Sequence, residues 1–539
     1  MPVTRRSRDD TAPPDTGTAT PSQTPGALLR RWLAPLLAAG LAGLGTVLGW
    51  RGVDLSAQVY RITLFRHEGM VLWDSQWYGG HWTFNYSVIF PPVAAGLGVA
   101  LTAALSAGTA AWAFDRLVVG HFGRTARVGS FAFAVGTAVP VAIGQLPFLL
   151  GEALALLACL TAARRRWALA IPLALATAAA SPLAAAFLAL AVAARLLASW
   201  PTNRLPLTGL LVAAAAPLAA SALLFPGPGS FPYPTSDFVF EACACVVMLA
   251  LVPRRERTLR VAAVLYVLAT AASYVLHTPM GGNIGRLAES VAIPVGACLL
   301  WAHRRVLLVV LAVPMALWQW TPAWGAMTAS ARDPSTHASY YAPLVQFLQA
   351  NATPIGRVEI VPTRYHWEVA YVAPDVPLAR GWERQLDIAD NPLFYRPGLD
   401  AAGLRRWLLD NGVRFVAVPD APLDYAGIAE AQVLAAGVPG LEPVFATPHW
   451  QVYAVTGSPG ILDGPATLVR LDGSRITIDA QQVGTAHLRV RWNPQWTVTA
   501  GSACVQAGAD SWTDVDLLGT GIIELDLQLR LRPPSQPVC

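Results

Sequence analysis

Long apolar runs dominate the chain from residue 32 to residue 323, and short polar or turn-rich segments separate them. A helix needs about 20 apolar residues to cross the ~30 Å hydrocarbon core of a bilayer, so the runs predict a polytopic α-helical membrane domain of about eleven spans. The predicted spans cover residues 32–50, 88–113, 128–146, 148–163, 167–180, 182–199, 206–225, 237–252, 258–276, 289–302 and 305–323.

Two of the boundaries between predicted spans rest on proline. Residues 167–199 form one apolar run that would extend roughly 50 Å as a single helix, which is too long for one crossing. Pro182 follows Ser181 in the middle of this run and should interrupt a helix. A similar break is expected at residues 144–147, where Gly144 and Pro147 flank two residues.

The pattern changes after residue 323, where charged residues and turn signals become frequent. Residues 339–351 and 404–411 have helical patterns, and residues 356–363 and 413–419 read as strands, which predicts an α/β domain over residues 324–460. From about residue 465 apolar and polar residues alternate with period two, so residues 461–539 are expected to form a small antiparallel β-sandwich.

Arginine placement predicts the orientation of the membrane domain. The chain has no lysine, and its arginines cluster at residues 30–31, 124–127, 164–166, 195–204, 254–260 and 304–305. With eleven spans all these clusters fall on the side of the N-terminus, and positive residues favour the cytoplasmic side. Residues 1–27, rich in Pro, Thr, Ser and Asp, then form a disordered cytoplasmic tail, residues 28–323 form the membrane domain, and residues 324–539 are extracytoplasmic.

The composition agrees with a membrane protein, and the absence of lysine together with abundant Ala, Gly and Pro suggests a bacterial genome of high GC content. Hydrophobic residues make up 54% of the chain and charged residues only 13%, against about 25% charged residues in soluble proteins. The net charge of +5 comes largely from arginines beside apolar segments, so no nucleic-acid partner is expected. Cys504 and Cys539 could form a disulfide if their domain is extracytoplasmic, and the spacing of the six cysteines does not resemble a zinc site.

Two of the predicted outer loops contain the residues best suited to chemistry. Loop 51–87 begins with Asp54, which is costly to desolvate at a membrane boundary unless it is used or paired; it could also cap a helix. Loop 277–288 contains Gly281, Gly282 and Gly285 followed by Arg286. A guanidinium beside glycine-rich backbone suits a phosphate oxyanion, although an interfacial arginine in a flexible loop is an equal alternative.

The stretch WDSQWYGGHWTFNYSVIFPP, residues 73–92, carries a more specific pattern. Its order Trp-x-x-x-Trp-Tyr-Gly-Gly, then Tyr86 and Phe-Pro-Pro, after a long loop that opens with an acidic residue, resembles the GT-C superfamily of membrane glycosyltransferases, particularly bacterial branches of the actinobacterial type. The motif covers about 40 residues, and the order of elements along the whole chain is similar. Asp54 is followed by Leu55, however, where some of these families have a paired Asp-Glu.

The resemblance implies transfer of a sugar from a polyprenyl-phosphate donor to an envelope glycan, lipid or protein acceptor, with inversion at the anomeric carbon. Asp54 would be the catalytic base, with Asp74 as the reserve candidate, and Arg286, assisted by Arg61 or Arg66, would bind the donor phosphate. The expected sugar- or acceptor-binding residues are Trp73, Trp77, Tyr78, His81, Asn85, Tyr86 and Asn283. Some members use Mg²⁺ or Mn²⁺, but the outer loops have no carboxylate cluster that argues for a metal.

Other interpretations remain open at this point. The aromatic residues could simply form an interfacial belt. A transporter or flippase would predict internal repeats and charges near the membrane midplane, and a scaffold would bind glycan or protein without catalysis. The sequence shows no repeat between its halves, and its polar groups concentrate in the loops.

Overall fold

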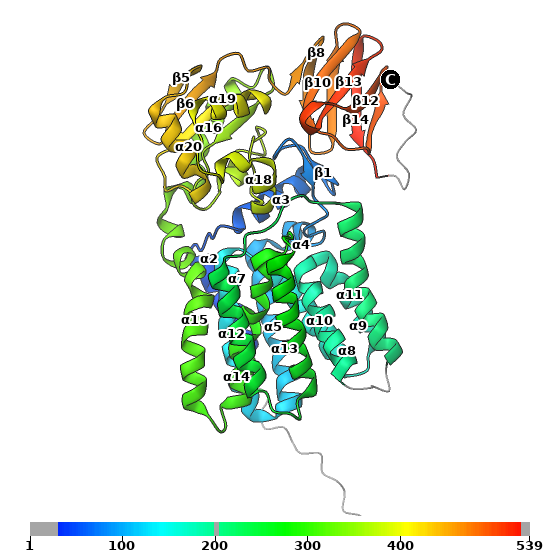
Figure 1. Cartoon of the computed structure of the whole chain (residues 1–539), viewed down its shortest axis with the longest axis vertical. Helices are drawn as coiled ribbons and strands as arrows, with labels where there is room; N and C mark the ends of the chain where they lie inside the picture. Colours follow the sequence, from blue (N-terminus) through cyan, green and yellow to red (C-terminus); the bar gives the residue numbers. More distant parts are fainter. Residues whose placement is uncertain (1–30, 199–203, 530–539) are drawn as a thin grey trace, which may run out of the picture.

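The computed structural model describes residues 31–198 and 204–529. Figure 1 shows a helical region with two sheet-containing units at one end of it. The expected disulfide cannot be followed because Cys539, unlike Cys504, lies outside the described residues, as does the expected disordered tail, residues 1–27.

The helical region is a bundle built mainly of apolar helices. Its helices are α2 (Leu33–Val47), α5 (Val99–Phe122), α6 (Arg127–Gly136), α7 (Ala138–Ile143), α8 (Leu146–Ala163), α9 (Trp167–Ala180), α10 (Pro182–Ala198), α11 (Arg204–Leu224), α12 (Thr235–Leu251), α13 (Arg257–Val275), α14 (Arg286–Leu300) and α15 (Arg305–Thr328). Among the described residues six helices are long and apolar enough to cross a membrane, or seven if the bent pair formed by α4 (Phe90–Leu97) and α5 counts as one. The chain therefore has the helices of a multi-pass membrane protein.

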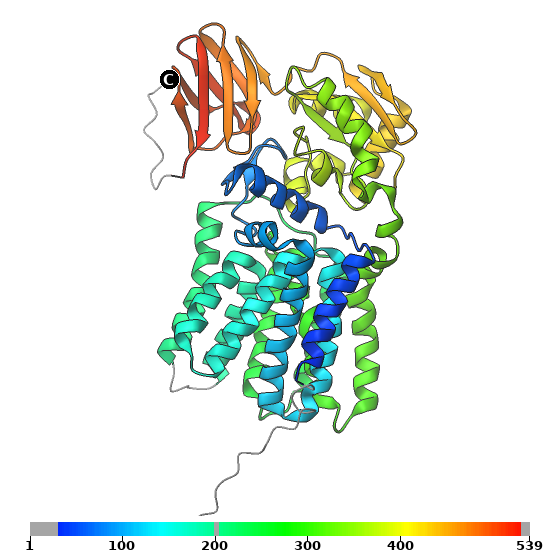
Figure 2. The same ribbon diagram turned by 180° about the vertical axis from the view of Figure 1, so that it is seen from behind.

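The expected helix breaks occur where the sequence places them. Helix α9 ends at Ala180 and α10 begins at Pro182, with Ser181 in an extended conformation between them. Helix α7 ends at Ile143 and is followed by Gly144, whose left-handed φ of 93° is easily adopted only by glycine, and α8 begins at Leu146. Figure 2 shows α2 beside α5, where small alanines on both helices pack closely.

The segment between α2 and α5 lies across the end of the bundle instead of continuing it (Figure 1). It contains α3 (Leu55–Glu68), a short hairpin of β1 (Trp73–Asp74) and β2 (His81–Trp82), and α4, which meets α5 at a bend of 113°. This segment forms a floor beneath the two sheet-containing units.

The first sheet-containing unit has a four-stranded sheet in the order β3-β4-β6-β5. The strands are β3 (Arg357–Ile360), β4 (Val413–Pro419), β5 (Leu441–Ala446) and β6 (Trp450–Val455), and the helices include α16 (Ala338–Ala350), α17 (Glu368–Tyr371), α18 (Arg384–Asp390), α19 (Ala401–Asp410) and α20 (Tyr425–Ala436). Strands β3 and β4 are parallel, and the other pairs are antiparallel. The loops after β3 and β4 therefore leave the sheet at the same edge.

The second unit consists of two antiparallel four-stranded sheets. One has the order β12-β13-β10-β7 and the other β11-β14-β9-β8. The strands are β7 (Leu462–Asp463), β8 (Ala466–Leu471), β9 (Arg475–Ala480), β10 (Gly484–Arg491), β11 (Trp496–Ala500), β12 (Ala503–Ala507), β13 (Trp512–Leu517) and β14 (Gly521–Leu527). Apolar residues from both sheets, among them Ile478, Leu488 and Trp496, are buried together between them, as the period-two pattern requires.

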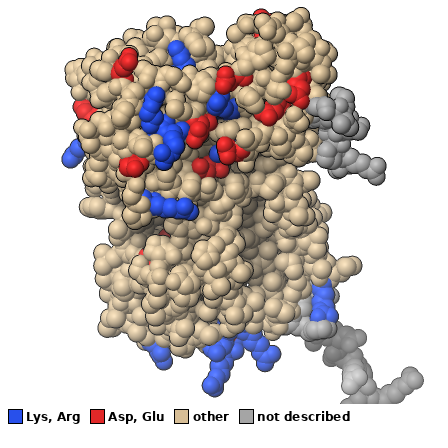
Figure 3. All heavy atoms as spheres, turned by 45° about the horizontal axis from the view of Figure 1, so that its top comes forward, with Lys and Arg blue, Asp and Glu red and all other residues tan. Residues whose placement is uncertain are grey.

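Charged side chains are distributed unevenly over the surface. Figure 3 shows both signs over the sheet-containing units, few charges along the sides of the helical region, and basic residues at its far end. Arginines lie at or just before the start of α6, α9, α13 and α15, and they include Arg124, Arg166, Arg257 and Arg305. The sides of the bundle are thus suited to lipid.

Candidate functional site

Asp54 and Arg286 lie together where the helical region meets the α/β unit. Asp54 immediately precedes α3, and Arg286 is the first residue of α14. A carboxylate oxygen of Asp54 lies 3.6 Å from a guanidinium nitrogen of Arg286, and both side chains are partly exposed. Asp54 occupies the N-cap position of α3, but its side chain makes no capping hydrogen bond. Its carboxylate contacts Arg286 instead. The residue expected to be the base and the residue expected to bind the donor phosphate are therefore in contact.

Close backbone packing holds Asp54 in this place. The amide of Asp54 donates to the carbonyl of Ile143 at 2.9 Å. A Cβ atom on Gly52 would lie 2.2 Å from the carbonyl oxygen of Ala142, and one on Gly144 would lie 2.2 Å from the amide nitrogen of Leu55. The linker before α3 can approach the end of α7 so closely only because both positions are glycine.

Replacing Gly52 with alanine is expected to displace this linker, because the atoms that the new methyl group would meet belong to the backbone of α7. The cost should be about 1–3 kcal/mol, as for other overpacked sites. Thermal unfolding of the purified protein, followed by tryptophan fluorescence, should show a lower melting temperature. Gly40→Ala is the matched control, since no atom lies within 4 Å of its Cβ position. Equal melting temperatures for the two variants would contradict the close packing.

Further polar residues surround the ion pair. The pKa of Tyr86 is raised by burial, and the charges of Arg286, Asp54 and Arg61 also influence it. The guanidinium of Arg61 lies 4.5 Å from the ring centroid of Tyr86 and forms a buried ion pair with Glu383 of the α/β unit. Arg61 thus connects the floor of the site to the unit above it.

Opposing effects act on the pKa of the Asp54 carboxyl group. Burial raises its pKa, whereas the charges of Arg286, His366 and Arg61 and a hydrogen bond with Gln145 lower it. A carboxylate in this balance can accept a proton, because it is neither fully solvated nor locked in a tight bidentate pair.

Asp74 and Arg66 are not part of this cluster. Asp74 is fully buried, where it accepts hydrogen bonds from the Tyr60 hydroxyl at 2.8 Å and the Gln76 amide at 2.9 Å, and burial raises its pKa to about 7. Arg66 is exposed at the end of α3 and donates to the carbonyl of Ala95 at 3.2 Å.

The aromatic residues of the 73–92 stretch are mostly buried in protein cores. Trp73 packs with Trp496 in the core of the two-sheet unit, and Trp77 and Tyr78 belong to the core beneath the α/β unit. The Trp77 ring lies between those of Tyr60 and His81. Burial lowers the pKa of His81 to about 3, so this imidazole is neutral. Their contacts are structural in this arrangement, and a sugar could reach them only after these cores rearrange.

The two asparagines are more accessible. Asn85 is half-buried, and its side-chain nitrogen lies 2.9 Å from the Cβ position of Gly227 in the loop before α12. Asn283 is half-buried in the short helical turn (Gly281–Gly285) that leads to Arg286. Together with Tyr86 they are the predicted sugar-binding residues with exposed surface.

An apolar cavity of about 510 Å³ lies within the helical region, lined by α8, α10, α12, α13, α14 and α15. Phe148, Glu152 and Ser290 line both this cavity and a smaller polar pocket that also contains Gln145 and Glu289. The Arg286 guanidinium lies 5.8 Å from the ring of Phe148. The apolar cavity therefore approaches the Asp54–Arg286 pair through a polar boundary.

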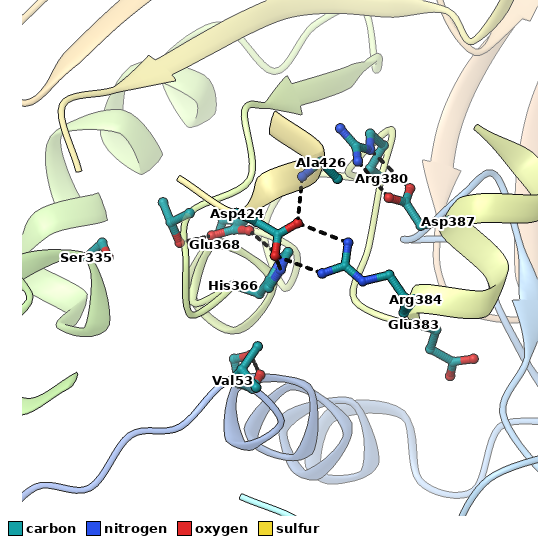
Figure 4. Close-up of polar contacts among 12 residues, drawn as sticks. Val53, Ser335, His366, Glu368, Arg380, Glu383, Arg384, Asp387, Asp424 and Ala426 are labelled. Carbon is teal, nitrogen blue, oxygen red and sulfur yellow. Dashed lines mark hydrogen bonds and ion pairs between the residues drawn. The ribbon is translucent and has the colours of Figure 1, made fainter. Parts of the chain in front are cut away.

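Sequence reasoning missed a cluster of buried charges in the α/β unit. Figure 4 shows His366, Glu368, Asp424 and Arg384 converging above Val53, the residue before Asp54. His366 follows β3 and Asp424 follows β4, so the two side chains come from loops at one edge of the sheet. This cluster could have been predicted from the sequence, because each of two predicted strands is followed by a titratable residue and ligand sites lie at the carboxyl ends of parallel strands.

The described residues contain no group of three or more His, Cys, Asp or Glu side chains that could hold a metal ion. The divalent cation therefore stays an expectation from the resemblance. No protein-family model matches the chain, and no curated protein matches it in sequence.

Proposed function

We propose that this protein is a membrane glycosyltransferase that moves a sugar from a polyprenyl-phosphate donor to a cell-envelope glycan, lipid or protein acceptor. The observation that carries the proposal is the contact between Asp54 and Arg286, which come from two separate loops and meet beside a polar pocket and an apolar cavity. A base, a cation for the leaving phosphate and a space for a lipid chain are the three parts that this chemistry needs.

The apolar cavity supports a lipid-linked donor. Its volume of about 510 Å³ and its almost purely apolar lining suit part of a polyprenyl chain, and it lies among helices whose outer faces are apolar. A donor with its chain in this cavity would bring its phosphate toward Arg286. The phosphate would then compete with Asp54 for the guanidinium and release the carboxylate for the acceptor.

The proposed reaction is a single inverting displacement. The acceptor hydroxyl oxygen forms a bond with the anomeric carbon while the bond from that carbon to the phosphate oxygen breaks. Asp54 takes the hydroxyl proton, and polyprenyl phosphate leaves with the electron pair, stabilised by Arg286. Tyr86, Asn85 and Asn283 are the proposed sugar contacts, and Arg61 holds the floor of the site against Glu383.

The proposed topology has about eleven crossings in a bacterial plasma membrane. It counts α6 and α7 as one span and α4 with α5 as another, and it adds the shorter apolar helices α2, α9 and α10 and also helix α12 to the long ones. The arginine-rich end is the cytoplasmic one by the positive-inside rule, so the sheet-containing units are extracytoplasmic.

The experiment that tests the function uses purified protein in lipid nanodiscs and a panel of radiolabelled polyprenyl-phosphate sugars. Wild type should bind at least one donor and transfer or slowly hydrolyse its sugar. Arg286→Gln should weaken donor binding by about 10–100-fold, because it removes a charged hydrogen-bond donor to the phosphate. Arg66→Gln is the matched control, since Arg66 lies at the other end of α3, and it should behave as wild type.

Absence of donor binding and turnover across the panel would contradict the enzyme and favour a transporter, a flippase or a non-catalytic scaffold. Equal losses in both arginine variants would contradict the specific role of Arg286.

A further inference from the structure

A second cleft, of about 460 Å³, lies between the floor and the two sheet-containing units. Its walls come from segments far apart in the sequence, which include the later turns of α3, the residues between α16 and β3, the start of β4, and the end of β8. None of the described residues that line this cleft also lines the apolar cavity or the small polar pocket. The reaction proposed above therefore leaves the cleft without a role.

Gln76 fixes the walls of the cleft relative to one another. Its side-chain amide donates to the Leu471 carbonyl of the two-sheet unit at 2.9 Å, and its backbone carbonyl accepts from the Leu378 amide of the α/β unit at 2.8 Å. Glu68, at the end of α3, accepts from the Gly473 amide at 3.0 Å. The cleft is therefore preformed, and its volume lies within the range of about 300–1,000 Å³ that is usual for ligand sites.

The lining of the cleft is apolar where it is buried and polar where it is exposed. The buried side chains include Tyr60, Leu64 and Val376, whereas Asp375 and Arg470 are exposed. A sugar ring has the same division, with apolar faces and hydroxyl groups around its edge. A lipid chain would favour a wholly apolar lining, such as that of the cavity in the helical region.

The charges of the lining disfavour an anionic ligand. Three carboxylates face two guanidinium groups, and the residues are Glu68, Asp375, Asp472, Arg414 and Arg470. Arg470 is already paired with Asp472 at 2.7 Å, and Arg414 forms no ion pair with any described residue. The carboxylates would repel a phosphate, but each keeps oxygen lone pairs that accept hydrogen bonds from hydroxyl groups, and Arg414 can donate to hydroxyl oxygens.

We propose that this cleft binds a neutral glycan and holds the part of the acceptor that does not react. The inference rests on the proposed function for the identity of the acceptor, but binding of a saccharide in the cleft does not depend on turnover. The lining residues of α3, from Tyr60 to Glu68, lie roughly 9–21 Å along the helix axis from Asp54. An acceptor that reaches both the cleft and the base must therefore be a chain of several sugar rings.

Binding of neutral hexose and pentose oligosaccharides to the full chain in nanodiscs tests the cleft without any donor. Ala352→Trp should weaken this binding by about tenfold or more, because the indole would fill the cleft from an exposed position of its wall. Ala435→Trp is the matched control, since Ala435 is exposed on α20 of the same unit and does not line the cleft. Isothermal titration calorimetry gives the affinities.

A second variant removes a polar contact instead of adding bulk. Asp375→Ala should weaken oligosaccharide binding by about tenfold, because it removes a charged acceptor for hydroxyl groups. Asp410→Ala is its control, since Asp410 is an exposed carboxylate of the same unit outside the cleft. Losses of equal size in the two aspartate variants would contradict a contact between the glycan and Asp375.

Acceptor length gives a kinetic readout. The ratio of the KM for a single-sugar acceptor to the KM for a long neutral glycan should be high in wild type and in Ala435→Trp, because the cleft holds only the long acceptor. The ratio should fall toward one in Ala352→Trp. A merely structural effect of the indole would change both KM values together and would overturn the proposal.

The outcomes separate the two proposals. Oligosaccharide binding that is lost in Ala352→Trp, without turnover of any donor, would support the saccharide site and contradict the glycosyltransferase. Turnover with the same KM for a long glycan in Ala352→Trp and wild type would support the enzyme and overturn the cleft. Absence of oligosaccharide binding, or tighter binding of a phosphate-bearing oligosaccharide or a polar peptide, would also overturn it.

Discussion

Asparagine in place of Asp54 is expected to lower sugar transfer by about 10²–10⁴-fold, the usual contribution of a general base. Donor binding should remain or become tighter, because the variant no longer pairs a carboxylate with Arg286 and leaves this guanidinium to the phosphate. Single-turnover transfer and donor affinity, measured on the same nanodisc sample, separate the two effects.

Asp74→Asn is the matched comparison, since Asp74 is the other aspartate of the same loop. It lies among Tyr60 and Gln76 and away from Arg286, so its replacement should leave transfer within about tenfold of wild type. Transfer that survives in Asp54→Asn but is lost in Asp74→Asn would move the base to Asp74 and contradict the site built around Arg286.

Methionine in place of Arg380 is expected to destabilise the α/β unit by about 3–5 kcal/mol, because it leaves buried carboxylates without their cation. Arg380 lies 2.6 Å from an oxygen of Asp387, 3.1 Å from Glu430 and 3.7 Å from Glu359, and all four residues are buried. Thermal unfolding should show a transition on the order of 10 °C lower for this unit. Arg396→Met, at an exposed position of the same unit, should melt as wild type.

The cost of Arg380→Met should depend on pH. Burial by itself would raise the pKa of Asp387, but Arg380 holds it below the usual range; wild type therefore gains stability above the unfolded pKa and loses it as the pH falls. Burial raises the pKa of Glu430 to about 7 and also raises that of Glu359, so without Arg380 their ionisation opposes folding more strongly as the pH rises. The difference from wild type should be larger at pH 8 than at pH 5.5, and a difference that grows on acidification would contradict this charge arrangement.

The sequence predicted local features of this protein better than contacts between distant segments. Proline and glycine gave the helix breaks at Pro182 and Gly144, because these residues act on the backbone next to them. The roles proposed for Asp54 and Arg286 came from loop chemistry, and their contact agrees with a common site. That contact depends on how α3 and α14 pack, which no local pattern specifies.

Burial of the aromatic stretch was not predictable from its neighbours in the chain. In the sequence Trp73 has the features of an interfacial residue. In the structure the turn between β8 and β9, far along the chain, packs beside it, and the Ser75 amide donates to the Gly473 carbonyl at 3.1 Å. His366 and Asp424 were missed for the same reason, because each is an ordinary loop residue until β3 and β4 align in parallel.

The contact between the 73–92 stretch and the two-sheet unit affects how the protein folds during its synthesis. The partner of Ser75 is synthesised 398 residues later, which at about 5–20 residues per second is a delay of roughly 20–80 s. During that time the ribosome is still adding the later helices and the α/β unit, and Trp73 has no two-sheet core to enter. The nascent loop must therefore stay soluble or be shielded until the last domain emerges, and a chain cut short before residue 473 would leave the Trp73 ring without its core and accessible to quality-control proteases.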